Sequence, residues 1–236
     1  MKRVVCSVLV ASLLVTAAPA ASAWSNGRSG PNSFGTHDWV LFKAVNAVGK
    51  PGRWVCMRTA LRATDDPDTV DGISYASGTW WHVYDVWGAS TYGDAPQAVD
   101  VWFRRALTRL RAGDRCGASR ALGIMSHMLG DVAQPMHTDQ TRLEERVHGP
   151  YEVAVDTRCR SRSTCRYRFS YDGVHRARPY ARTVAVATKA HRYYSPLVTT
   201  YARYGYNAKV DTITRRQLNR AAQALADLVV ALQRRR

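Results

Sequence analysis

The feature that most constrains this chain is a series of histidines and carboxylates at helical spacing. His127 and Asp131 are four residues apart, and His148 and Glu152 repeat that spacing, with His137 between the two pairs. Residues four apart lie on one face of an α-helix, so each pair can offer an imidazole and a carboxylate to one cation. A surface ion pair readily explains one such pair, but it is a poor explanation for two. The pattern therefore predicts helices that present a metal centre.

The rest of the chain also has apolar residues at helical spacing. Helices are expected over residues 37–48, 53–63, 95–112, 117–132, 147–155, 177–204 and 212–236. A long ordered loop or short helices are expected over residues 69–93, and a small hairpin over residues 159–173. Because no repeat or break in composition divides the chain, we predict one compact all-α domain over residues 24–236.

The N-terminus has the three parts of a secretory signal peptide. Lys2 and Arg3 form a basic start, residues 4–15 are mostly apolar, and Ala21-Ser22-Ala23 resembles a cleavage site. The apolar run is too short to cross a bilayer, so no transmembrane anchor is expected after processing. We therefore predict a signal peptide at residues 1–23 and a secreted, extracellular protein that begins at Trp24.

Cysteine usage agrees with export. Four cysteines remain after the signal peptide, and an even number is typical of disulfides in an oxidising compartment. Four cysteines allow three pairings. We favour Cys159–Cys165, which closes a short loop, and hence Cys56–Cys116. Zinc thiolates are the alternative, but the sequence has no C-x-x-C motif.

The composition narrows the class of partner. Apolar residues make up 46% and charged residues 22% of the chain, which excludes a wholly disordered protein. The formal net charge of +16 favours anionic partners, including phospholipid headgroups, nucleic acid and acidic polymers. Charge alone does not choose among them.

The string GDVAQPMH, which ends at His137, resembles the zinc-dependent phospholipase C family when taken with His127, His148 and Glu152. That family is related in fold to the secreted single-strand-specific zinc nucleases. The resemblance runs in order through the mature chain. It includes the expected N-terminal Trp24, an early Thr-His-Asp-Trp segment at residues 36–39, the aspartates of residues 65–68, and a histidine beside aromatic residues at 80–85.

The resemblance implies three Zn²⁺ ions per chain. The first zinc would be held by one aspartate of residues 65–68 together with His82, His127 and Asp131. The second would be held by His137, His148 and Glu152. The third would be held by the α-amine and carbonyl of Trp24, by His37 and by a shared Asp131. Asp65 and Asp68 are equally good candidates, with Asp66 behind them. His175 and His191 are left over and are expected at the surface.

The chemistry implied is phosphodiester hydrolysis by a metal-bound hydroxide, with Asp65 or Asp68 as the general base. Trp81 and Tyr84 are candidates to line a substrate pocket, although aromatics beside a helix more often belong to the core. The protein is expected to be a monomer.

Three functions are compatible with the sequence. Glu152 as the last ligand and the short spacer before His148 favour a phospholipase C acting peripherally on membrane phospholipid. The basic charge suits a nuclease acting on single-stranded nucleic acid. A non-enzymatic cationic binding protein with a structural metal site is the third possibility, but structural zinc sites usually have four ligands, and this set is larger.

Overall fold

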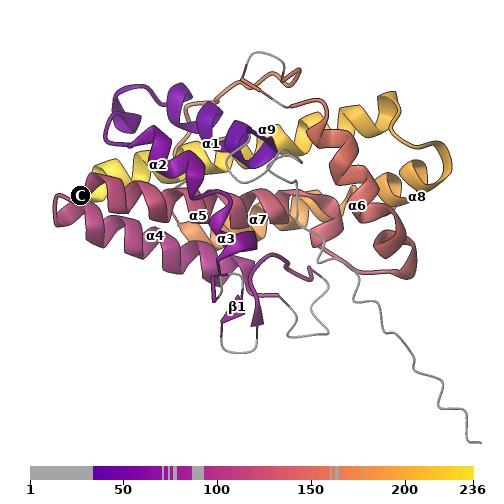
Figure 1. The fold of residues 1–236 in the computed structure, drawn as a ribbon, viewed down its shortest axis with the longest axis horizontal. Coiled ribbons are helices and arrows are strands. Elements are labelled where there is room, and N and C mark those ends of the chain that lie inside the picture. The colour runs from indigo at the N-terminus through magenta and orange to yellow at the C-terminus, as the bar shows by residue number, and fades with distance from the viewer. Residues whose placement is uncertain are drawn as a thin grey trace, which may run out of the picture.

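The computed structural model describes residues 34–70, 72–73, 75–76, 79–86, 93–159, 161–162, 165–176 and 178–236, and the fold is all-α, as expected (Figure 1). Its helices are α1 (Thr36–Ala47), α2 (Met57–Arg62), α3 (Asp66–Thr69), α4 (Ala95–Arg111), α5 (Arg115–Ala133), α6 (Arg142–Asp156), α7 (Pro179–His191), α8 (Tyr194–Tyr204) and α9 (Ala208–Arg235). Short 3₁₀ turns are η1 (Lys50–Gly52) and η2 (Pro135–His137). Strands β1 (Tyr75–Ala76) and β2 (Thr79–Trp80) form an antiparallel pair. None of the described helices has the length and hydropathy needed to span a membrane.

Helix α5 lies at the centre of the molecule. It packs against α4 and α2 on one side and against α9, α7 and α1 on the others (Figure 1). From Ala118 to Ala133, every side chain except that of Arg120 is buried. A helix that is apolar nearly all round is stable only when it is surrounded by other elements. The polar residues on α5, His127 and Asp131, therefore lie in the interior of the protein.

Two glycines allow close approach to α5. A Cβ atom on Gly123 would lie 2.2 Å from the carbonyl oxygen of Ala60 on α2. A Cβ atom on Gly130 would lie 2.8 Å from Nδ1 of His37 on α1. Because real Cβ contacts are not this short, a side chain at either position would push the neighbouring helix away. Gly130 thus lets the His37 ring reach the level of Asp131.

The helix ends explain where the observed elements differ from the expected ones. Helix α6 begins at Arg142, earlier than residue 147, because the Thr141 hydroxyl accepts a hydrogen bond from the backbone N–H of Glu144 and caps the helix. The helix expected over residues 177–204 is two helices, α7 and α8. Pro196 lies in the first turn of α8, where its missing N–H is tolerated, but it would break a continuous helix.

Three other predicted segments also differ from the observed secondary structure. The range 53–63 is helical only in α2, after η1 and a turn. The hairpin expected over residues 159–173 is wrong, because no strand occurs in the described part of that segment. The short β1–β2 pair lies instead in the range 69–93, for which only loop or helix was predicted.

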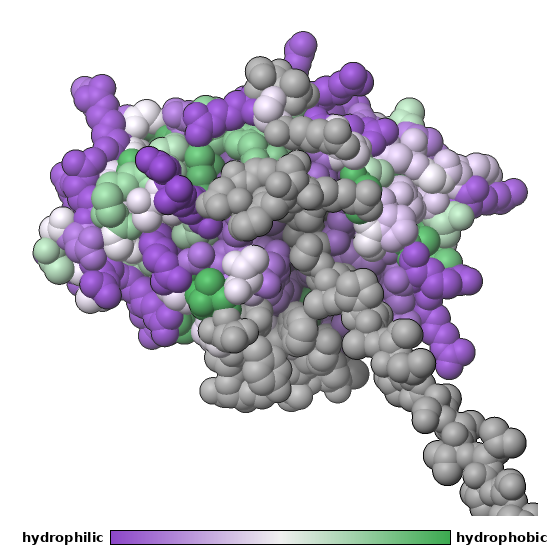
Figure 2. Space-filling model, in the orientation of Figure 1, coloured by the Kyte–Doolittle hydropathy of each residue, from purple (hydrophilic) through white to green (hydrophobic). Residues whose placement is uncertain are grey.

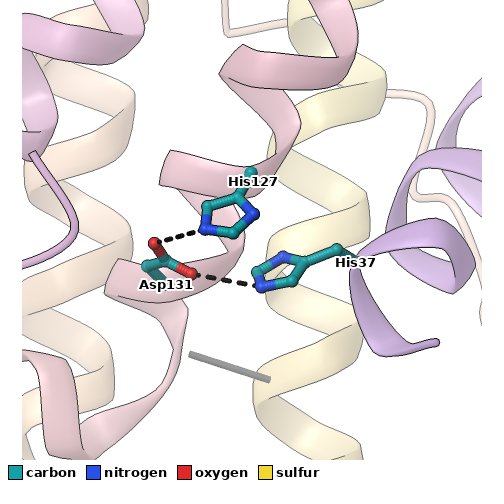
Figure 3. A group of neighbouring side chains, drawn as sticks. All are labelled: His37, His127 and Asp131. Atoms are coloured by element: carbon teal, nitrogen blue, oxygen red, sulfur yellow. Dashed lines mark ion pairs between the residues drawn. The ribbon is translucent and has the colours of Figure 1, made fainter. Parts of the chain in front are cut away.

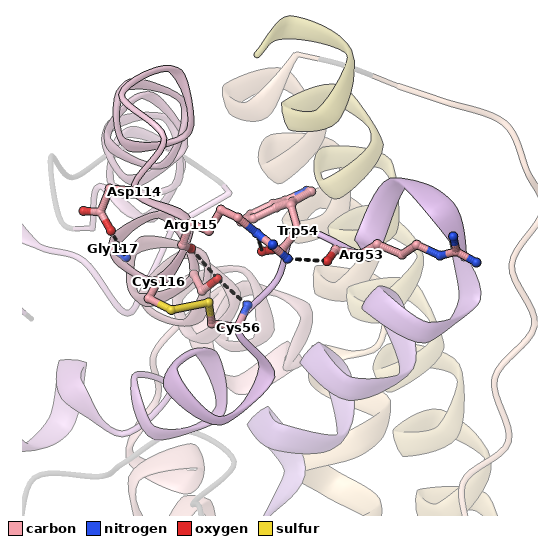
Figure 4. Close-up of a disulfide and its surroundings, with 8 residues drawn as sticks. Arg53, Trp54, Cys56, Asp114, Arg115, Cys116 and Gly117 are labelled. Atoms are coloured by element: carbon pink, nitrogen blue, oxygen red, sulfur yellow. Dashed lines mark hydrogen bonds between the residues drawn. A yellow bond between two sulfur atoms is a disulfide. The ribbon is translucent and has the colours of Figure 1, made fainter.

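Both expected disulfides, Cys56–Cys116 and Cys159–Cys165, are present in the structure. The first joins the start of α2 to the first turn of α5 (Figure 4). The backbone around it is tied as well, because the backbone N–H of Cys56 donates to the Ser119 hydroxyl at 2.8 Å, and the Arg115 guanidinium donates to the carbonyl oxygens of Arg53 and Trp54 at 2.7 and 3.1 Å. This end of α2 is therefore held firmly against α5.

Candidate metal centre

The structure gathers the predicted ligands into three groups of donor atoms, each within 4.8 Å of one another. The members of group 1 are His37, His127 and Asp131. The members of group 2 are Asp68, His82 and His127. The members of group 3 are His137, His148 and Glu152. Groups 1 and 2 share His127, so they form one continuous site.

Asp131 is the centre of groups 1 and 2. One carboxylate oxygen, Oδ1, is 3.3 Å from Nε2 of His37, and Oδ2 is 3.2 Å from Nε2 of His127 (Figure 3). Oδ2 is also 2.7 Å from Nδ1 of His82. Figure 3 shows the three side chains of group 1 converging from α1 and α5, and the rings of His37 and His127 stack at 4.0 Å. One fully buried carboxylate thus faces three imidazoles.

Group 3 is built where the chain leaves α5 and enters α6. Pro135 ends the helical run and begins the turn η2, which places His137 opposite the first half of α6. Oε1 of Glu152 is 2.8 Å from Nε2 of His148 and 3.7 Å from Nε2 of His137. The two Nε2 atoms are only 3.0 Å apart.

The other ring nitrogen of each central histidine faces an acceptor outside its group. Nδ1 of His127 is 2.7 Å from the carbonyl oxygen of Thr64, and Nδ1 of His137 is 2.9 Å from the carbonyl oxygen of His82. Nδ1 of His148 contacts the carboxylate of Glu144. Since these acceptors carry no proton, Nδ1 must donate, and in a neutral ring Nε2 is then a lone pair. In their neutral form the three rings would therefore direct three Nε2 lone pairs into the site, where a cation can replace the proton.

This arrangement fits a divalent zinc ion. In group 3, two imidazole lone pairs and a carboxylate oxygen converge within a few ångströms, and they repel one another unless a cation or a proton lies between them. In group 1, Oδ1 of Asp131 is buried without a hydrogen bond among the described residues, beyond its ion-pair contact with His37. Imidazole nitrogens oriented by acceptors behind them, together with carboxylate oxygens, are typical zinc ligands.

The pKa values of the candidate ligands also show that positive charge is stabilised in this site. Burial alone would lower the pKa of His127, but the carboxylates of Asp131 and Asp68 outweigh it and raise the pKa to about 10. Burial is likewise outweighed at His148, where Glu152 and Glu144 raise the pKa to about 10. The pKa of Asp131 is lowered despite burial, because the His127 and His82 rings face it. The lowered pKa favours the ionised form of Asp131 in the interior.

The aspartates of residues 65–68 are separated by the structure. Oδ1 of Asp68 is 3.5 Å from Nε2 of His127 and 3.9 Å from Nε2 of His82, so Asp68 belongs to group 2. Asp66 forms an ion pair with Arg120 at 2.6 Å. Asp65 precedes α3 and is in none of the groups found among the described residues. Trp24 lies outside the described residues.

The remaining candidates lie beside the site. Trp81 and Tyr84 are partly buried and pack against the hydrophobic core. The backbone N–H of Tyr84 donates to the carbonyl oxygen of His137 at 3.0 Å, so this segment borders group 3. His175 is exposed, as expected, whereas His191 is half-buried with Nδ1 3.1 Å from the carbonyl oxygen of Thr138.

Two buried residues that support group 3 were missed by sequence reasoning. Glu144 is 4% exposed and contacts His148, and the Gln134 amide donates to Oε1 of Glu152 at 2.9 Å. Glu144 precedes His148 by four residues, the same spacing as the pairs that were recognised. That spacing was available in the sequence as a signal.

Comparison with known proteins identifies the fold. No model of a known protein family matches the chain, and no curated protein matches it in sequence. Several solved structures are similar to it, and two of them are alpha toxins. The alpha toxin from Clostridium absonum has a TM-score of 0.70 at 15% identity over 88% of this chain. The alpha toxin of Clostridium perfringens from an avian strain has a TM-score of 0.66 at 14% identity over 89%.

The chain spans 65% of the length of each toxin chain. The match covers 88% or 89% of the present chain. The chain therefore has the alpha-toxin fold, the fold implied by its resemblance to the zinc-dependent phospholipase C family.

Proposed function

We propose that this protein is a secreted, zinc-dependent phospholipase C that hydrolyses phospholipid to diacylglycerol and a phosphorylated headgroup. The observation that supports the proposal is that groups 1 and 2 share His127 and that Asp131 of group 1 also contacts His82 of group 2, with a third group beside them. A single structural metal would need one closed set of about four ligands. A larger set with shared members supports a multinuclear centre, and such centres bind and cleave phosphate esters.

In this proposal, group 2 with Asp131 would hold one zinc and group 3 a second. A third would be held by His37, Asp131 and the N-terminal Trp24. When bound, zinc supplies positive charge for the phosphodiester oxygens and lowers the pKa of a coordinated water toward about 7.

The chain's own residues then have distinct tasks. Thr64, His82 and Glu144 orient the histidine rings through the Nδ1 contacts described above. Asp68 is the proposed general base, because it is the member of group 2 whose side chain, at 24% exposure, substrate can reach. Burial raises its pKa, which makes the carboxylate a better proton acceptor than an exposed aspartate. Asp65 has no comparable position.

The test is hydrolysis of phosphatidylcholine and of single-stranded DNA in parallel, with zinc content measured on the same sample. We expect about three zinc ions per chain, diacylglycerol release and loss of activity with a chelator. DNA cleavage without lipid hydrolysis would show the nuclease instead, which the net charge of +16 also suits. A protein that binds one zinc and hydrolyses neither substrate would be a binding protein with a structural metal.

A first prediction concerns Glu144. Glu144→Gln keeps the size of the side chain but removes the charge that orients His148, so zinc affinity should fall by about 10- to 100-fold. The measurement is competition with a chromogenic chelator, which reports metal affinity independently of activity. The matched control is Glu145→Gln, because Glu145 is the exposed neighbour on the same helix. Equal affinities in the two variants would show that Glu144 does not support the metal site.

A further inference from the structure

Two hollows beside α5 are rich in arginine, which supplies three of the six residues that line one and four of the nine that line the other. The hollow between α2 and α5 has a volume of about 440 Å³, and its lining includes Arg58, Arg62 and Arg120. The hollow between α4 and α5 has a volume of about 650 Å³, and Arg120 also lines it. Because one residue borders both, the two hollows form one continuous surface.

We call this surface the arginine face. Its arginines, all exposed, are Arg58, Arg62, Arg104, Arg105, Arg109 and Arg120. Three carboxylates partly neutralise it, because Asp66, Asp100 and Asp114 pair with Arg120, Arg104 and Arg109. Figure 2 shows hydrophilic residues interspersed with hydrophobic ones over the left part of the view, where Figure 1 places α4. The face has a clear excess of positive charge.

Among the described residues, three arginines of this face have no ion pair: Arg105, which lies over the Trp102 ring, and Arg58 and Arg62. Arg58 and Arg62 are one turn apart on α2. Two like charges at this spacing repel each other and destabilise an isolated helix slightly. The Cys56–Cys116 disulfide nevertheless holds the backbone of α2 against α5 (Figure 4). Arg58 and Arg62 therefore line the same hollow as Arg120, where their guanidinium groups can bind an anion.

The arginine face adjoins the metal centre through α3. That helix contributes Asp66 to the lining of the first hollow and Asp68 to group 2. An anionic surface bound at the hollow would therefore be within one short helix of the proposed catalytic group. Val70, which follows α3 directly, is an apolar residue with 40% exposure.

We propose that the arginine face docks the protein on membranes that contain anionic phospholipid. This inference rests on the proposed phospholipase function and names the kind of lipid surface that the enzyme would engage. Guanidinium groups bind phosphate in a bidentate manner, and each basic residue near a membrane adds to binding through the negative surface potential. An exposed apolar side chain beside a basic surface suits an interface between headgroups and acyl chains.

Single-stranded nucleic acid fits this face less well. Proteins that bind it combine basic grooves with exposed aromatic rings on which the bases stack. Among the residues that line the two hollows, Trp102 alone is aromatic, and it is 6% exposed. Its ring is covered by the Arg105 guanidinium at 4.3 Å. The face therefore offers positive charge with no accessible stacking surface.

The test is co-sedimentation of the zinc-loaded protein with vesicles in brief incubations. One set of vesicles is phosphatidylcholine alone, and the other contains phosphatidylserine at about one lipid in four, which sets the surface potential. The double variant Arg58→Gln, Arg62→Gln should bind the anionic vesicles about tenfold or more weakly than the unaltered protein. The control, Lys189→Gln with Arg203→Gln, removes the same charge from exposed positions on α7 and α8 and should change binding by about twofold at most.

Each other result would overturn the proposal. Equal loss of binding in both double variants would show that net charge acts without a specific face. Loss of binding to a single-stranded oligonucleotide, with vesicle binding intact, would assign the face to nucleic acid. Melting temperatures of the variants show that they are folded. Hydrolysis is measured separately on the unaltered protein, so failure of the proposed activity and failure of docking are distinguishable.

Discussion

Replacing Asp131 with alanine is expected to reduce phosphodiester hydrolysis by about a thousandfold, because metals typically supply several kcal/mol of transition-state stabilisation. The reason is the geometry around this carboxylate. Its two oxygens face His37, His127 and His82 at 3.3, 3.2 and 2.7 Å. Without it, three imidazoles remain with no buried negative charge between them, so two of the proposed zinc ions lose a ligand at once.

The comparison is with His148→Ala, which removes a ligand of group 3 only. Zinc content and the rate of hydrolysis are measured together. Asp131→Ala should lose more zinc and leave less activity than His148→Ala. Asp131→Asn, which keeps the shape of the side chain, separates loss of metal from misfolding. Equal zinc content and residual activity in the alanine variants would argue against a shared ligand.

The second large effect is expected on stability. The Cys56–Cys116 disulfide closes a loop with a sequence separation of 60 residues, whereas Cys159–Cys165 closes one with a separation of 6. A disulfide stabilises the fold mainly by reducing the conformational entropy of the unfolded chain, and this reduction is larger for a longer closed loop. The double variant Cys56→Ser, Cys116→Ser should therefore lower the free energy of unfolding by about 4 kcal/mol. The corresponding double variant of the short disulfide should lose about 2 kcal/mol.

Denaturant unfolding of both double variants tests this order. The structure gives a reason for a further loss in the first variant, because the disulfide holds together the junction at which Arg115 bonds to the carbonyl oxygens of Arg53 and Trp54. A smaller loss in that variant than in the short-disulfide variant would contradict the argument. It would mean that these hydrogen bonds and the packing of α2 fix the junction without the covalent link.

The long central helices could be predicted from the sequence because their apolar stripes are continuous and their ends carry ordinary signals. The limits of α4 and α5 fall within one or two residues of those expected. The first turn of α6 was missed because its apolar stripe begins late, although Thr141 and Glu144 form a capping pattern. The break between α7 and α8 was signalled by Pro196 but hidden by apolar residues on both sides of it.

For the candidate site, the sequence indicated which residue types would meet, but not which atoms. Local spacing places His127 with Asp131 and His148 with Glu152, since each pair shares one helix face. Spacing could not choose between Asp65 and Asp68, because the choice depends on how the four-residue helix α3 is oriented over α5. Contacts through backbone carbonyls, such as that of Thr64 with His127, depend on tertiary packing and have no side-chain pattern.

His82 joins the two parts of the centre in a way that links their occupancy. Its ring faces Asp131 in the shared site, while its own carbonyl oxygen holds the ring of His137 in group 3. The backbone N–H groups of Tyr84 and Val86 bond to the carbonyl oxygens of His137 and Thr138, so residues 82–86 are tied to η2. We therefore expect a ligand that orders His82 to order His137 as well. In that case filling one part of the centre reduces the conformational entropy that filling the other must still remove.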